Sequence, residues 1–238
     1  MSRTREKKKY PESAESGTFW VSTLLDMDSR LRVARGIGKD ETQASQEVFE
    51  TLNDLGHSDG PPPLITDGWG GIDDAILAVY GLVPKYSGKG RPPTRPKAGP
   101  DWRYLQMIKH RDEHGRLQSI ELKAVWGNLD ELVQLMGEST AYVERDNLTS
   151  RLFNARLTRK TLAFSKDIRF HRAALIWEDA YYNLVRPHKS LRLRVTDAES
   201  KTKWIKRTPA MAAGLTDHIW TVKELLTMVR VPTPNNIV

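Results

Sequence analysis

Cysteine is absent from the 238 residues of the chain. Its absence excludes disulfide bonds and metal sites built on thiolates. Long apolar runs are missing too, since no stretch approaches the roughly 20 residues that a membrane-spanning helix needs. The first nine residues, MSRTREKKK, are basic and lack the apolar centre of a secretory signal. These absences predict a cytoplasmic protein without a membrane partner.

Positive charge is in excess. Lysine and arginine number 37 against 30 acidic residues, which gives a formal net charge of +7 and an isoelectric point near 9.5. Such a balance is compatible with a polyanionic partner, but on its own it is a statement about solubility. Hydrophobic residues make up 39% of the chain. The chain is therefore long and apolar enough to bury a core, either as one large domain or as a core with a smaller embedded part.

The N-terminal third alternates strand-like and helix-like segments. Residues 1–16 are polar and basic, and are predicted to be disordered. Residues 17–38 read as a hairpin with its turn at residues 26–29. Residues 39–56 carry apolar side chains at helical spacing and end at Gly56.

A short apolar run ends on a single acid in LITDGWGGIDDAI, residues 64–76. Leu64 and Ile65 indicate a buried strand, glycines mark its exit, and a short helix follows. Asp67 would then lie at the tip of the strand, which is a common place for a metal ligand or an acid/base group. The alternative is an ordinary turn aspartate that bonds its own backbone.

Residues 84–127 are predicted to form an insertion. Its first part, 84–100, is a basic segment rich in proline and glycine that cannot hold regular structure. Its second part, 102–127, contains two strand-like runs around a turn at His114-Gly115 and predicts a hairpin of its own.

From residue 128 onward the pattern is helical, with helices predicted over 139–157 and 167–184 and short helices in the tail. On the first helix, Glu144 shares a face with Asn147 and Arg151. Near that side, apolar residues are expected to seat the helix on the sheet: Leu148, Leu152 and Ala155. Further basic residues follow as candidate DNA contacts: Arg156, Arg159, Lys160 and Lys166. The alternative is a solvated helix in which Glu144 pairs with Arg145 or Arg151.

Asp67 and Glu144 together suggest a divalent-metal site. Mg²⁺ prefers carboxylate oxygens and keeps several waters, so a few protein ligands suffice. Two such ions about 4 Å apart stabilise both the attacking and the leaving oxygen of a phosphoryl transfer.

Five stretches resemble bacterial insertion-sequence transposases of the DDE type, close to the InsAB group: TDGWGG, TAYVERDNLTSRL, ARLTRKTLAFSK, YYNLVRPHKSLR and RTPAMAAGLTDH. The resemblance implies an α/β fold with an RNase H-like core, in two parts at 17–83 and 128–190, followed by a helical C-terminal tail at 191–238. It implies DNA cleavage and strand transfer with Mg²⁺ or Mn²⁺, on element ends and target DNA, by a homo-oligomer on DNA. Asp67 matches the second acid of the family pattern, and Glu144 matches the final glutamate. Both are implied to be catalytic metal ligands.

One part of the family pattern has no counterpart. The first aspartate of the family lies on a strand before the hairpin, and this chain begins after that point in the pattern. Asp26 and Asp28 lie in the predicted hairpin turn, where an acid is ordinary. We therefore expect this chain alone to be catalytically impaired, and a non-catalytic DNA-binding transposase remnant is the alternative.

Overall fold

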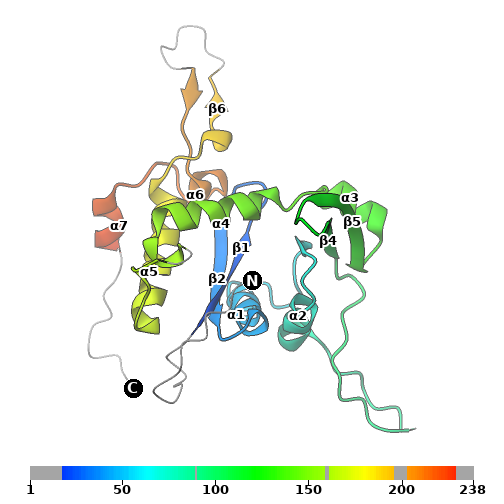
Figure 1. Cartoon of the computed structure of the whole chain (residues 1–238). Helices are drawn as coiled ribbons and strands as arrows, with labels where there is room; N and C mark the ends of the chain where they lie inside the picture. The colour runs from blue at the N-terminus through cyan, green and yellow to red at the C-terminus, as the bar shows by residue number, and fades with distance from the viewer. Residues whose placement is uncertain (1–17, 89, 159–160, 196–202, 229–238) are drawn as a thin grey trace.

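The computed structural model describes residues 18–88, 90–158, 161–195 and 203–228. They form a mixed α/β chain with small sheets and several helices (Figure 1). The first sheet is the antiparallel hairpin of β1 (Trp20–Leu25) and β2 (Arg32–Gly38). At its turn, the Asp26 carboxylate accepts the backbone N–H of Ser29 at 2.8 Å. The hairpin predicted over 17–38 is confirmed.

Helix α1 (Glu41–Asp54) lies against this hairpin. Its first turn is capped by Asp40, whose side chain accepts the N–H of Gln43 at 2.8 Å. Its buried face carries Ala44, Val48, Phe49 and Leu52 at helical spacing. Strand and helix backbones approach closely, because a Cβ at Gly36 would collide with the carbonyl oxygen of Ala44. The predicted helix over 39–56 is confirmed.

The second sheet has the strand order β3-β4-β5. Strand β3 (Leu64–Asp67) pairs in parallel with β4 (Tyr104–Arg111), which pairs antiparallel with β5 (Leu117–Trp126). The hairpin expected within 84–127 is therefore present, and its strand β4 joins the sheet that contains Asp67. Parallel pairing requires a long crossover. That crossover is supplied by α2 (Ile72–Tyr80) and the segment after it.

The main core lies between the helices α1 and α2 and the second sheet. It contains Phe49, Leu52, Leu64, Ala75, Ile76, Tyr80, Trp102 and Tyr104. Helix α1 contacts both strands of the hairpin as well as α2, so one helical layer serves both sheets. Within the described residues the two sheets are not hydrogen-bonded to each other: β1 pairs with β2 and β3 pairs with β4.

The second half of the chain is mainly helical. It comprises α3 (Leu129–Met136), α4 (Ala141–Phe153), the 3₁₀ turn η1 (Ala155–Leu157) and α5 (Ile168–Ala180), which continues as the π-helical turn η2 (Tyr181–Val185). Figure 1 shows α4 reaching from the region of β4 and α3 across to α5. The helices predicted over 139–157 and 167–184 are confirmed, with α4 ending at Phe153.

The tail contains the turn η3 (Lys189–Leu191), the short hairpin of β6 (Leu193–Arg194) and β7 (Trp204–Ile205), and helices α6 (Pro209–Ala212) and α7 (Val222–Met228). The short helices were predicted from the sequence, whereas the hairpin was not. In the part of the chain that the structure describes, no helix has both the length and the apolar character to cross a membrane.

Candidate functional site

Asp67 lies at the carboxyl end of β3 and is exposed. One of its oxygens, Oδ1, accepts the backbone N–H of Trp69 at 3.4 Å. The loop after it is held on the neighbouring strand, because Gln106 on β4 donates to the Trp69 carbonyl at 3.2 Å. A Cβ at Gly68 would come within 2.9 Å of the Ile108 side chain, so glycine allows the loop to cross β4 closely. The strand-tip position predicted for Asp67 is confirmed.

A second carboxylate lies within electrostatic reach of Asp67. Glu41 is the first residue of α1, and its pKa is raised by burial and by the negative charge of Asp67. The corner between β3 and α1 therefore carries a concentrated negative potential, which attracts cations. The sequence pattern did not single out Glu41, because a helix-start glutamate is common for purely local reasons.

Glu144 lies in the first turn of α4, with its side chain 58% exposed, and forms an ion pair with Lys109 of β4. Asp67 is opposite Met107 in the parallel register, and Lys109 lies two residues beyond Met107. Two residues advance a strand by about 7 Å. Lys109 therefore links Glu144 to the end of the sheet at which Asp67 lies. Neither Arg145 nor Arg151, the partners that the sequence suggested, makes this pair.

Helix α4 is seated by polar side chains and not by the expected apolar ones. Leu148 and Leu152 are 55% and 74% exposed. Asp146 and Ser150 are buried in their place, on the side of the helix that faces β2 and α5. The prediction that Leu148, Leu152 and Ala155 seat the helix is wrong, since a buried arginine from β2 takes the facing position.

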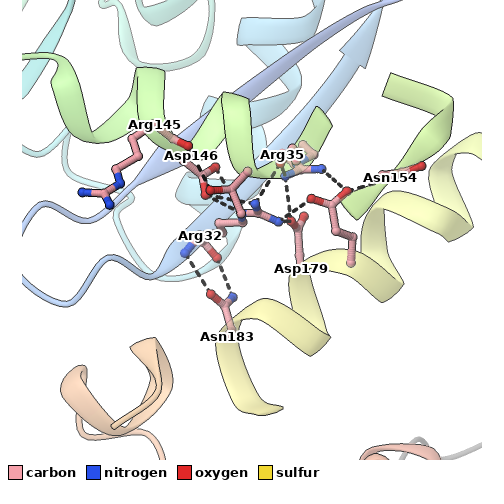
Figure 2. Close-up of polar contacts among 10 residues, drawn as sticks. Arg32, Arg35, Arg145, Asp146, Asn154, Asp179 and Asn183 are labelled. Atoms are coloured by element: carbon pink, nitrogen blue, oxygen red, sulfur yellow. Dashed lines mark hydrogen bonds and ion pairs between the residues drawn. The ribbon is translucent and has the colours of Figure 1, made fainter. Parts of the chain in front are cut away.

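That arginine is Arg32, whose side chain is only 1% exposed. Its Nε donates to Asp146 at 2.9 Å, and one terminal nitrogen donates to Ser150 at 2.8 Å. The other terminal nitrogen contacts Glu178 at 2.8 Å and Asp179 at 3.0 Å, both on α5 (Figure 2). A single guanidinium thus ties the hairpin to α4 and α5.

Two further contacts complete this arginine anchor. Asn183 donates to the backbone carbonyl of Arg32 at 2.9 Å and accepts its N–H at 3.0 Å (Figure 2). The Arg32 guanidinium also lies 4.0 Å from the ring centroid of Tyr182. Through Asp146, the arginine anchor fixes the helix whose first turn carries Glu144.

The charges of the arginine anchor do not balance. Two guanidiniums, Arg32 and Arg35, face three carboxylates: Asp146, Glu178 and Asp179. Burial opposes the charged form of Arg32, but the three carboxylates outweigh it and raise its pKa. Burial raises the pKa of Asp179 to about 6, against the opposing effect of Arg35. Asp179 is therefore the carboxylate of the arginine anchor that takes up a proton most readily.

The predicted DNA-contacting residues are placed as follows. Asn147, Arg151 and Lys166 are exposed, and Arg156 is exposed while donating to the Ser165 hydroxyl at 2.8 Å. Arg159 and Lys160 lie outside the described residues.

The two acids of the hairpin turn behave as the sequence predicted. The Asp26 carboxylate accepts both the N–H and the hydroxyl of Ser29, so it serves the turn. Asp28 is exposed in the same turn. Both positions are therefore those of ordinary turn acids.

The residues of the site that could bind a metal ion are two carboxylates, Asp67 and Glu144. Asp67 and Glu144 each present an exposed carboxylate at one end of the sheet. Mg²⁺ is commonly held by one or two carboxylates together with waters and substrate phosphates. Across 18–88, 90–158, 161–195 and 203–228, no three or more acidic or histidine side chains are grouped to hold a metal. Asp67 and Glu144 are therefore the two residues here that could contribute carboxylate oxygens to such an ion.

Comparison of the chain with known protein families, with curated proteins and with solved structures found no match.

Proposed function

We propose that this chain is a DDE-type transposase of a bacterial insertion sequence, with an RNase H-like core that cleaves DNA and transfers strands. The observation that carries the proposal is the placement of two acids far apart in the sequence. Asp67 ends β3, and Glu144 is joined through Lys109 to β4, the strand that pairs with β3. A strand end and a helix start thus carry the two carboxylates, and the Lys109 ion pair links the helix to the sheet.

The order of the elements also supports the proposal. A hairpin, α1, β3, α2 and β4 follow one another, and one layer of helices serves both sheets. Among the described strands, β1 and β3 each have one unpaired edge. In the family pattern, the strand that carries the first aspartate precedes the hairpin. The free edges of β1 and β3 offer backbone groups with which such a strand could form hydrogen bonds.

The residues of the site have separate roles in this proposal. Asp67 and Glu144 would hold Mg²⁺ or Mn²⁺, which when bound stabilises the charge on the attacking and leaving oxygens of phosphoryl transfer. Lys109, released from Glu144, supplies a cation for a phosphate at the same place. Asn147 and Arg151 follow Glu144 on exposed positions of α4 and would orient the DNA backbone. Arg32 positions α4 without contacting DNA.

The proximity of the two acids can be tested directly, because the chain has no cysteine to interfere. The double variant Asp67→Cys/Glu144→Cys should be joined by a thiol cross-linker of about 8 Å, the span over which two carboxylates can share a metal pair. The matched control is Asp54→Cys/Glu144→Cys, in which the first cysteine lies at the far end of α1 from Glu41, about 20 Å along the helix. Equal cross-linking of the two variants, or none in the first, would contradict a shared site.

The chemistry is tested with a nicking and strand-transfer assay in Mg²⁺ or Mn²⁺. Because the first aspartate of the family pattern has no counterpart, wild-type cleavage is expected to be weak. Asp67→Asn and Glu144→Gln should each abolish the metal-dependent cleavage that remains, whereas Asp28→Asn should leave it unchanged. Cleavage that survives both site variants would overturn the assignment. DNA binding by the wild type without any cleavage would favour the non-catalytic DNA-binding remnant.

A further inference from the structure

The β6–β7 hairpin of the tail is rich in lysine and arginine, in contrast to the candidate site around Asp67 and Glu144. We define the basic arm as residues 189–195 and 203–207, which include β6 and β7. Its residues include six cationic side chains: Lys189, Arg192, Arg194, Lys203, Lys206 and Arg207. The stretch between its two parts, 196–202, adds Asp197, Glu199 and Lys201 to the sequence, so 189–207 has seven basic and two acidic residues. Figure 1 shows β6 and the strand paired with it projecting away from the helices of the body. The arm is therefore a local concentration of positive charge on an extended ribbon.

The cations of the arm are available to a partner. Lys189, Arg194, Lys203 and Lys206 are exposed, and none of them forms an ion pair with a described carboxylate. Arg207 donates to the Leu191 carbonyl at 2.8 Å and thereby fixes the base of the arm. Cations close together repel one another, so their arrangement favours a partner that supplies regularly spaced negative charge.

The two-stranded ribbon of the arm contributes little to a buried core. Its two strands pair only Leu193 with Ile205 and Arg194 with Trp204. The apolar side chains stay exposed, Trp204 by 42%. The Arg192 guanidinium lies 3.9 Å from the Trp204 ring centroid and stiffens the ribbon. Because that cation covers one face of the indole, the ring is poorly placed to stack between unpaired bases.

Positive potential continues from the arm to α4. His188 donates its N–H to the Arg207 carbonyl at 2.8 Å, so it lies at the base of the arm. The pKa of His188 is lowered by burial and by three arginines around it: Arg186, Arg145 and Arg30. Arg145 follows Glu144 directly in α4. Arginines thus surround the histidine at the base of the arm.

We propose that the basic arm binds the phosphate backbone of duplex DNA, as a second DNA-contacting surface beyond the predicted cluster after Glu144. A two-stranded ribbon with cations on exposed positions fits phosphates along a duplex. The inference rests on the proposed function for the choice of DNA as the polyanion, but it does not require that Asp67 and Glu144 catalyse a reaction. It specifies backbone contact and no base sequence.

The experiment measures binding of a fluorescent duplex of arbitrary sequence by anisotropy, over a series of salt concentrations, with EDTA present. The variant is Arg194→Glu/Lys203→Glu. The matched control is Arg116→Glu/Lys123→Glu, which makes the same charge change on exposed positions of the β4–β5 hairpin. The arm variant should bind about tenfold more weakly at moderate salt, and the slope of log affinity against log salt should fall by about 2, near 0.9 per lost phosphate contact.

Three results would overturn the proposal: an unchanged arm variant, an equal loss in the control variant, or a loss confined to single-stranded DNA. Circular dichroism and the thermal midpoint confirm folding, and both substituted positions are exposed, so a misfolded arm variant is not expected. If it does misfold, Lys206→Gln replaces it, with a slope change of about 1 expected. EDTA removes divalent metal from the assay, so a failure of the cleavage proposal leaves this measurement unaffected.

Discussion

Removing the guanidinium of Arg32 should destabilise the protein more than any other single charge removal at the α4–α5 junction. The informative substitution is Arg32→Met, which keeps an apolar stem of similar length and removes only the charged fork. Asp146, which is 2% exposed, then loses its principal partner, and Glu178 and Asp179 lose one of their two cations. Arg35 alone is left against three carboxylates.

The magnitude follows from this geometry. Breaking a buried ion pair by removing one partner costs about 3–5 kcal/mol, because the remaining charge is uncompensated and poorly hydrated. That is a large share of the roughly 5–15 kcal/mol that stabilises a typical domain. The cost should be greatest near about pH 8, where all three carboxyl groups are ionised, and smaller below about pH 6, where protonation relieves the surplus charge.

Urea denaturation followed by tryptophan fluorescence measures this cost. The control is Arg172→Met, which removes the Arg172–Glu47 pair, whose side chains are 45% and 29% exposed. An exposed pair of this kind contributes under about 1 kcal/mol. A loss for Arg32→Met no larger than that of the control would refute the view that the arginine anchor holds α4 in place.

Two further predictions concern Asp179 on α5 and Gly36 on β2. Because burial raises the pKa of Asp179 to about 6 from 3.8, its folded form holds a proton more tightly than its unfolded form. Wild-type stability relative to Asp179→Asn should therefore fall by at most about 3 kcal/mol as pH rises from about 4 to about 6, and level off above that; parallel pH curves for the two proteins would contradict it. Gly36→Ala should cost about 1–3 kcal/mol in urea unfolding, because its Cβ would collide with the Ala44 carbonyl, whereas Gly70→Ala, which meets open space, should be nearly neutral. Equal effects of the two alanine substitutions would show that the strand and helix separate easily.

The sequence by itself determined the local elements. Apolar side chains at helical spacing predicted the helix over 39–56, and strand-like runs around a turn predicted the hairpin over 17–38. Glycine punctuation after an apolar run placed Asp67 at a strand tip. These features depend on residues close in the chain, so periodicity and turn chemistry are enough to reveal them.

Sequence spacing also placed Glu144 on a helix, but it misjudged which side of that helix is buried. It favoured Leu148 and Leu152 because apolar residues usually face a core. The structure buries Asp146 and Ser150, since Arg32, far away in the chain, lies opposite them. A charge opposite a helix face leaves no periodic trace in the sequence of that helix.

Long-range pairing was decided only by the tertiary structure. The hairpin at 102–127 was visible as a local pattern, but its parallel pairing with the strand of Asp67 depends on a crossover of many residues. The ion pair between Lys109 and Glu144 likewise joins a strand to a helix that follows it at a distance. Such contacts form because the packed core brings surfaces together, and the free energy that selects them belongs to the whole fold and not to any short segment.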